Sequence, residues 1–377
     1  MTLRAVALAL LLALPAQAQD TETVLIARRA AQALAQAAVA LEEATGARDR
    51  VAALTRTVKA YEEGLNALRE GLRRAAIREE TIRIAFEAKR DEIARLTGAL
   101  AGVERVREPL LLLHPAGPLG TARAGMLLAE ITPALQAEAA ALRVELDEAS
   151  MLRALQEGAT ATLAEGLKGA QAARLALSQA ISERAPLPRR FADDPEALAA
   201  ILASVDTLES FAAGLTAVPL AGSAADGPPF RDSRGGALPL PVEASLLRGF
   251  GEPDAAGVAR PGLLVATRPL ALVTAPAAAT VRYAGPLLDY GNVIVLEPEA
   301  GYLMVLAGLG QLYAQSDEVV AEGAALGLMG GQAPGAGEFL GAAQQGAGGE
   351  RPETLYIELR VGGTPVDPGE WFALKRG

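Results

Sequence analysis

The chain has 377 residues, a formal net charge of −10, a single His (His114) and no Cys. Without Cys there is no thiol nucleophile, disulfide or thiolate metal ligand, and one His excludes a multi-His metal site or a His-based dyad. The negative charge, with no basic cluster, argues against a nucleic acid partner, because phosphate binding needs a local excess of Lys and Arg. Abundant Ala and Leu with only 4% aromatic residues is typical of long packed helices.

The first residues have the pattern of an export signal. Arg4 supplies a positive start, an apolar run follows over residues 5–14, and Ala16-Gln17-Ala18 is a small-x-small cleavage pattern. We expect a secretory signal peptide over residues 1–18. The alternative, an uncleaved membrane anchor, is disfavoured because the apolar run is too short to span a bilayer. No later segment is long and apolar enough for a transmembrane helix, so we expect a soluble periplasmic protein.

Residues 21–106 contain no Pro and have strong helical periodicity. A heptad seam is interrupted only by the charged residues Glu79 and Lys89, and a weaker repeat precedes it at Ile26, Leu34 and Leu41. Such a repeat predicts a coiled coil. The apolar seam positions are Val51, Leu54, Val58, Tyr61, Leu65, Leu68, Leu72, Ala75, Ile82, Phe86, Ile93, Leu96, Leu100 and Val103.

The first helix is expected to stop near Pro109, because proline removes a helix hydrogen bond and holds the preceding residue extended. His114 lies in this Pro- and Gly-rich turn and is interpreted as a surface or packing residue. A second apolar periodicity over 121–182 predicts a returning helix. Residues 19–184 are therefore predicted to form an antiparallel coiled-coil hairpin.

Residues 185–220 are predicted to be a linker that contains one amphipathic helix. Pro186 and Pro188 end the hairpin, and Asp194-Pro195 has the pattern of a helix start, so the helix is expected over 194–215. Its function is open between a regulatory plug and simple packing against the hairpin. The apolar face consists of Leu198, Ile201, Leu202, Val205, Leu208 and Leu215.

The pattern changes to short strands in residues 238–377, after a Gly-, Ala- and Pro-rich linker over 221–237. Apolar, β-branched and aromatic runs at 279–283, 293–296, 302–306 and 355–359 predict an all-β domain, interrupted by a Gly-rich loop over 330–349. The expected fold class is α+β multidomain: a helical hairpin and a short helix, followed by this all-β domain.

Residues 238–372 contain a series of short motifs that are individually unspecific. They are Phe250-Gly251, Arg260-Pro261-Gly262-Leu263-Leu264, Ala279-Thr280-Val281, Tyr290-Gly291-Asn292-Val293, the strand around Leu303, Glu322-Gly323, Thr354-Leu355-Tyr356-Ile357-Glu358-Leu359-Arg360 and Pro365-Val366-Asp367-Pro368. In this order they resemble the LytM (lysostaphin-type) zinc metallopeptidases, whose domain is of the duplicated hybrid motif type.

The departures from that family concern its metal site. The resemblance places Arg260 and Leu264 where the family has a His and an Asp zinc ligand, and Thr354 and Tyr356 where it has a His-x-His segment. The family's other catalytic His corresponds to a position near Ala307. Because Arg repels a dication and Leu and Ala offer no donor atom, we expect no metal, no cofactor, no catalytic residue and no peptidase activity.

A degenerate LytM domain behind a helical hairpin resembles the EnvC family of murein hydrolase activators. The resemblance implies a groove that binds cell-wall amidases, a hairpin that binds the FtsEX membrane complex, and a helix that covers the groove at rest. The implied groove residues are Arg260, Pro261, Leu264, Tyr290, Leu355, Tyr356, Glu358 and Arg360.

Other interpretations of these residues and of the chain stay open. Tyr290 and Tyr356 are alternatively strand aromatics of a core, and Glu358 and Arg360 a solvated pair. The alternative functions are a wall-binding scaffold without amidase activation and an efflux or secretion adaptor. An adaptor is disfavoured because it needs half of its β domain on each side of the hairpin, whereas residues 19–50 are predicted to be helical.

Overall fold

A computed structural model describes residues 21–91, 94, 98, 117–184, 187, 207–217, 230–236, 238–253, 257–332 and 353–374. The signal peptide, His114, the turn near Pro109, the first part of the predicted linker helix and most of the Gly-rich loop lie outside these residues. The chain divides into two compact units. One comprises residues 1–67, 165–338 and 348–377, and the other residues 68–164 and 339–347.

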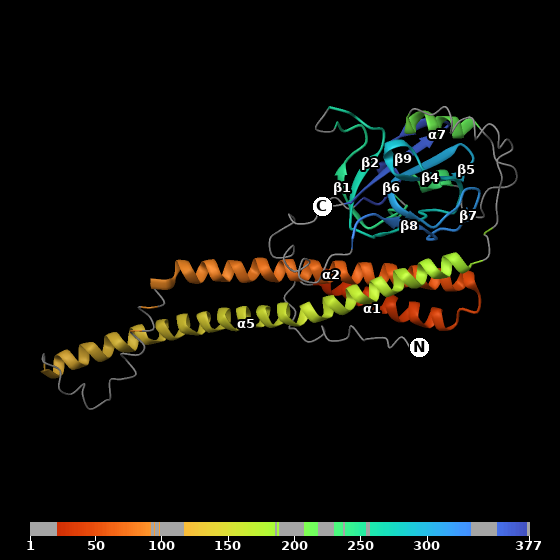
Figure 1. The fold of residues 1–377 in the computed structure, drawn as a ribbon. Helices are drawn as coiled ribbons and strands as arrows, with labels where there is room; N and C mark the ends of the chain where they lie inside the picture. The colour runs from red at the N-terminus through yellow and green to blue at the C-terminus, as the bar shows by residue number, and fades with distance from the viewer. Residues whose placement is uncertain are drawn as a thin grey trace. The chain divides into compact units, whose positions relative to one another are not determined.

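The helical region contains α1 (Thr21–Glu42), α2 (Ala47–Ala88) and α5 (Gly117–Glu183) (Figure 1). The first helix is not continuous with the second, contrary to the expectation of one periodic segment. The interruption falls at residues 43–46 and ends at Gly46, a poor helix former whose carbonyl accepts the hydrogen bond of Arg50 N at 3.0 Å at the start of α2. None of the described helices is long and apolar enough to cross a membrane.

Helices α2 and α5 contact each other within each of the two units. Near the base, Gly169 lies against the ring of Tyr61, where an added Cβ would come within 2.6 Å of it. Farther along, Arg78 pairs with Glu148 at 2.7 Å. The seam residues Leu54, Val58, Leu65, Leu72 and Ile82 are buried, as their heptad positions predict.

The C-terminal region is a single ten-stranded sheet in which every paired strand is antiparallel. The order along its main path is β1-β2-β9-β6-β5-β4-β7, with β10 on β9 and with β3 joined through β8 to β6. This confirms the expected fold class of helices followed by an antiparallel β domain. The strands are β1 (Ala244–Arg248), β2 (Leu263–Thr267), β3 (Leu272–Thr274), β4 (Ala279–Pro286), β5 (Asn292–Glu299), β6 (Tyr302–Leu312), β7 (Val319–Val320), β8 (Ala325–Met329), β9 (Glu353–Val361) and β10 (Thr364–Val366).

The central strands of the sheet are buried on both faces, in two separate clusters. Because successive side chains of a strand point to opposite faces, Leu355, Ile357 and Leu359 of β9 enter the main core, whereas Tyr356 between them enters the second cluster. On β6, likewise, Leu306 belongs to the main core, and Val305 to the second cluster. Few strand side chains in the centre of the sheet therefore remain free to contact water.

A short 3-10 helix, η2 (Phe230–Ser233), lies in the segment expected to be a linker. Phe230 is buried and stacks on Trp371 with ring centroids 5.0 Å apart, and both rings meet Tyr302 edge-on. The described residues 230–236 are therefore part of the β domain and depart from the linker prediction over 221–237. The sequence signal for this is the lone aromatic residue in a Gly- and Pro-rich segment.

The base of the hairpin packs on the β domain within the first unit. Leu54, Val58 and Leu177 form one apolar cluster with Leu272 and Leu328. The buried carboxylate of Glu62 accepts hydrogen bonds from Arg174 Nη2 at 2.7 Å and from the backbone N of Leu272 at 3.0 Å. At the end of α5, Arg184 pairs with the buried Glu318 at 3.0 Å.

Candidate functional site

Three of the positions at which the resemblance places lost zinc-site residues lie side by side on neighbouring strands. Leu264 of β2 and Ala307 of β6 are the register partners of Tyr356 on β9, one on each side. Thr354 lies two residues earlier on β9 and is exposed. The sheet surface that carries Leu264, Ala307 and Tyr356 is called the site face below.

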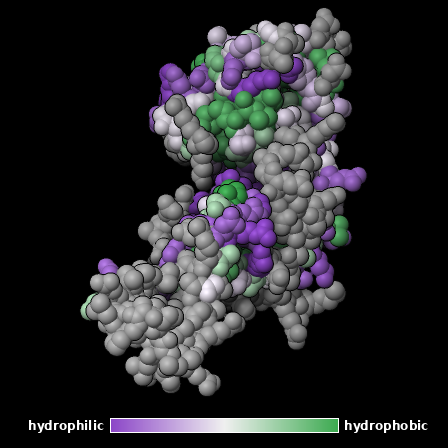
Figure 2. Space-filling model, turned by 90° about the vertical axis from the view of Figure 1, so that its left-hand side faces the viewer, coloured by the Kyte–Doolittle hydropathy of each residue, from purple (hydrophilic) through white to green (hydrophobic). Residues whose placement is uncertain are grey.

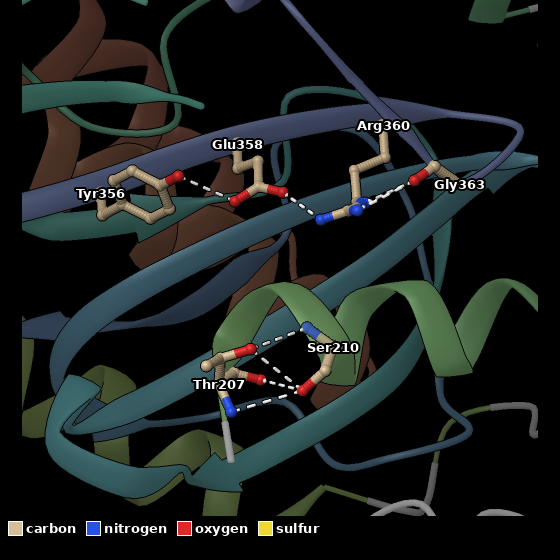
Figure 3. A network of polar contacts seen from close by, with 6 residues as sticks. All are labelled: Thr207, Ser210, Tyr356, Glu358, Arg360 and Gly363. Carbon is tan, nitrogen blue, oxygen red and sulfur yellow. Dashed lines mark hydrogen bonds and ion pairs between the residues drawn. The ribbon is translucent and has the colours of Figure 1, made fainter. Parts of the chain in front are cut away.

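A buried polar chain runs along β9 on the site face. Tyr356 Oη donates to Glu358 Oε2 at 2.8 Å, and Arg360 Nη1 donates to Glu358 Oε1 at 2.6 Å (Figure 3). Arg360 Nε and Nη2 also donate to the carbonyl of Gly363 at 3.0 and 2.9 Å. Because Glu358 and Arg360 are 1% and 3% exposed, the interpretation as a solvated pair is wrong.

The hydroxyl of Tyr356 is held neutral by its surroundings. Burial raises its pKa well above the ordinary range for tyrosine, and the charge and hydrogen bond of Glu358 raise it further. The ring itself fills the space beside Gly262, where an added Cβ would come within 2.7 Å of it. Tyr356 is therefore a fixed, uncharged donor in the position where the family has a His.

Arg260 and Tyr290 lie at the edge of the site face. The guanidinium carbon of Arg260 is 5.8 Å from the centroid of the Tyr290 ring, a cation–π arrangement. Arg260 is exposed, whereas Tyr290 and Pro261 are half-buried. Tyr290 and Leu264 pack against the apolar cluster on the site face.

One predicted groove residue faces the other way. Leu355 is fully buried in the main core, in the same cluster as Leu263 and Ile357. Its assignment to the groove is wrong because adjacent residues of a strand point to opposite faces of the sheet. The other predicted groove residues of β9 (Tyr356, Glu358 and Arg360) alternate with it on the opposite side.

Helix α7 (Leu208–Ala217) covers the site face. Its buried side chains, which are at most 3% exposed, pack in one cluster with Ala307, Tyr356 and strand residues of β5 and β6. Four residues of α7 take part: Leu208, Phe211, Ala212 and Leu215. Of the predicted regulatory face, Leu208 is found here, whereas Leu198, Ile201, Leu202 and Val205 lie outside the described residues.

The helix begins at a defined cap. Ser210 N donates to Thr207 Oγ1 at 3.1 Å, and Thr207 N donates to Ser210 Oγ at 3.3 Å, the reciprocal pattern of a capping box (Figure 3). Thr207 itself is not helical. The helix expected over 194–215 therefore has a cap inside its predicted bounds, and it ends at Ala217.

The end of α7 is held by a buried arginine of β4. Arg282 Nη2 donates to the carbonyl of Leu215 at 3.1 Å. Arg282, which is 4% exposed, also pairs through Nη1 with the carboxylate of Glu297. The sequence prediction missed Arg282, because nothing in the order of residues links β4 to a helix that precedes it by many residues.

The β domain also has apolar side chains that α7 does not cover. Leu246 and Leu247 on the edge strand β1, with Phe250 and Val258 in the loop that follows, are between 39% and 52% exposed. Figure 2 shows apolar surface on the β domain. These residues belong to none of the buried apolar clusters of the described residues.

The side chains at the site do not fit a zinc ion. Arg260 carries a positive charge, Leu264 and Ala307 have no donor atom, and the Tyr356 hydroxyl is neutral and already donates to Glu358. Glu358 in turn is engaged by Arg360. Across the described part of the chain, His, Cys, Asp and Glu form no group of three or more that could hold a metal ion.

Comparison with known proteins identifies the β domain. Residues 259–368 match the family model described as Peptidase family M23. The C-terminal domain is an M23 domain of the LytM type. Over 137 residues the chain is 28% identical to an uncharacterised protein of Neisseria meningitidis serogroup B. This match covers 36% of this chain and 20% of that protein.

Several solved structures are similar to part of this chain at low sequence identity. A Pseudomonas aeruginosa protein assigned to peptidase M23 is 19% identical with a TM-score of 0.29, and the match covers 41% of this chain and 56% of that one. A zinc-containing peptidase of Vibrio cholerae is 20% identical with a TM-score of 0.28, covering 36% and 39%. Helicobacter pylori Csd3 is 17% identical with a TM-score of 0.28, and the match covers 38% of this chain and 38% of that one. The chain thus spans about half or less of these relatives.

Proposed function

We propose that this protein is a non-catalytic activator of periplasmic peptidoglycan amidases of the N-acetylmuramoyl-L-alanine type. The observation that carries this proposal is the position of α7, which lies on the site face of an M23 domain against Ala307 and Tyr356. A substrate cleft would need access to water and to the cell wall. A face buried beneath a helix instead suits an interaction that competes with that helix.

The chemistry of the site face supports binding rather than hydrolysis. A zinc peptidase of this fold activates water on a metal held by His and Asp side chains. Here Tyr356, Leu264 and Ala307 provide an apolar and aromatic surface, and the only carboxylate of the polar chain, Glu358, is neutralised by Arg360. Apolar and aromatic surfaces of this kind are typical of helix-binding sites.

Activation follows if the site face binds the active conformation of the amidase more tightly than its resting one. In the resting activator, α7 occupies the face and reduces its effective affinity for the amidase. An event that releases α7 therefore raises the fraction of activator that can bind. We further propose that the hairpin receives this event from an FtsEX-type membrane complex during cell division.

The experiment measures release of dye from labelled peptidoglycan by a purified amidase of the same organism. The full mature chain alone, with or without added zinc, should release no dye, but it should accelerate the amidase. A variant with Phe211→Ser and Leu215→Ser, in which α7 no longer packs, should accelerate it more strongly. The control is Leu175→Ala, which changes an exposed apolar residue of α5.

Two outcomes would contradict the proposal. Dye release by the protein alone, lost with a chelator and restored by zinc, would mean that the domain is a peptidase. No acceleration by either the native chain or the double variant would remove the activator function and would favour the alternative of a wall-binding scaffold.

A further inference from the structure

The apolar contact between α7 and the site face has a simple spacing. Leu208, Phe211, Ala212 and Leu215 stand at positions i, i+3, i+4 and i+7, which share one side of a helix. Leu208 is 3% exposed, and Phe211, Ala212 and Leu215 are completely buried. The site face therefore accepts a narrow stripe of two Leu, one aromatic residue and one small residue.

The aromatic position of this stripe is specific. The ring of Phe211 meets Tyr283 of β4 edge-on, with centroids 4.9 Å apart and an interplanar angle of 77°. Such edge-to-face pairs add to the free energy of burial. The adjacent Ala212 is completely buried, so the strand side chains leave little space for a larger residue there.

The site face also distinguishes the two ends of the helix. The last turn of an α-helix leaves carbonyl groups without partners and carries partial negative charge. Arg282 Nη2 donates to one of these carbonyls, that of Leu215, and the guanidinium is fixed by Glu297 from the other side. A helix in the reverse direction would direct N–H groups and positive partial charge at Arg282.

We propose that the site face selects helices by direction, with Arg282 as the residue that recognises the carboxyl-terminal end. On this inference, which rests on the proposed function, the amidase contributes an amphipathic helix with the spacing of α7. That helix has an aliphatic residue at i, an aromatic residue at i+3, a small residue at i+4 and an aliphatic residue at i+7. It ends within one turn of the residue at i+7. It lies on the sheet in the same direction as α7.

The test uses a labelled peptide of residues 207–217 with blocked ends, and the same sequence reversed. When the reversed peptide lies the other way round, it places its apolar side chains as α7 does, but its amino-terminal end meets Arg282. The receptor is the full mature chain with Phe211→Ser and Leu215→Ser, so that its own α7 does not compete. Binding is measured by fluorescence anisotropy.

The forward peptide should bind saturably, and the reversed peptide about tenfold or more weakly, which corresponds to the loss of one hydrogen bond to a charged donor. Adding Arg282→Gln to the receptor should weaken binding of the forward peptide about tenfold. It should not weaken binding of the reversed peptide, because the change removes a positive charge that faces the amino-terminal end of that helix. Because that change leaves Glu297 buried without its cation, a receptor with Arg282→Gln and Glu297→Gln is tested as well. Arg231→Gln, at an exposed arginine, is the control.

Equal affinities for the two peptides would overturn this inference. So would an unchanged affinity for the forward peptide in the Arg282→Gln receptor and in the Arg282→Gln, Glu297→Gln receptor, provided that both receptors fold normally. The result separates it from the proposed function. Directional peptide binding without any acceleration of an amidase would leave the recognition rule intact and remove the activator. Acceleration of the amidase by the Phe211→Ser, Leu215→Ser chain, with equal affinities for the two peptides, would support the activator function and remove the recognition rule.

Discussion

Replacing Phe211 by Ala tests whether α7 is a separable element. The ring is completely buried and pairs edge-on with Tyr283. Truncation of a buried Phe to Ala costs about 3–5 kcal/mol where the surroundings cannot collapse. A loss of about 3 kcal/mol raises the population of the released helix about a hundredfold, because each 1.4 kcal/mol is a factor of ten.

The assay is hydrogen exchange of backbone amides in the native protein. Exchange within α7 should rise about a hundredfold in Phe211→Ala, whereas amides of β6 should keep their protection, because α7 opens locally. Leu306→Ala in the main core is the comparison, since it should lower the free energy of unfolding of the whole β domain. Leu175→Ala, at an exposed position of α5, should change neither.

Two results would refute this reasoning. If Phe211→Ala increases exchange in β5 and β6 as much as in α7, the helix is an integral part of the core and cannot act as a removable cover. If exchange in α7 does not change, Phe211 does not hold the helix on the site face. In either case amidase stimulation by this variant should equal that of the native chain.

Three further predictions concern individual contacts. Thr207→Ala removes the cap of α7 and should cost about 1 kcal/mol, seen as roughly fivefold faster exchange in α7, whereas Thr207→Ser should not. Arg174→Gln removes the ion-pair partner of the buried Glu62 and should lower the free energy of unfolding, measured in urea, by about 3–5 kcal/mol. Burial raises the pKa of Glu62, so this loss of stability should become smaller as the pH falls through that pKa and the carboxyl becomes neutral. The pKa of Tyr356 is higher in the folded protein than in the unfolded chain, where it is about 10. The neutral hydroxyl therefore contributes its full stabilisation below about pH 10, and this stabilisation is lost as the pH rises further. In Tyr356→Phe, the decline in the free energy of unfolding above about pH 10 should accordingly be smaller.

The sequence predicted the elements whose signals are local. The heptad spacing placed Leu54, Val58 and Leu65 in a buried seam, and the β-branched runs placed the central strands of the sheet. Both signals repeat with the period of the element that carries them, so they can be seen without knowledge of the fold. The interruption before α2 has a weaker signal, a single Gly46, and the heptad count passed over it.

The site was only partly predictable, because it depends on which strands become neighbours. Register brings Leu264, Tyr356 and Ala307 together across three strands that are far apart in the chain. The resemblance to LytM peptidases named these positions, but it could not tell that Leu355 points into the main core. Strand alternation would have excluded Leu355, since its neighbour Tyr356 was already assigned to the site.

The contacts of α7 were the least predictable part. A helix face rich in Leu predicts burial but not the surface that buries it, and the partners Tyr283 and Arg282 lie on a strand that follows a long linker. The buried pair of Arg282 and Glu297 has no sequence signal of its own. Such pairs are recognised only when the fold brings the two charges together.

The two faces of the sheet explain how an M23 domain can keep its fold without residues suited to zinc. Leu263, Ile357 and Leu306 hold β2, β9 and β6 together from the main core, on the side away from the site face. On the site face, the chain Tyr356–Glu358–Arg360 satisfies its own buried polar groups, and the remaining apolar side chains are covered by α7. Removing α7 would therefore expose an apolar surface without removing any support of the main core. That separation of the two clusters is the physical condition for a cover that opens while the domain stays folded.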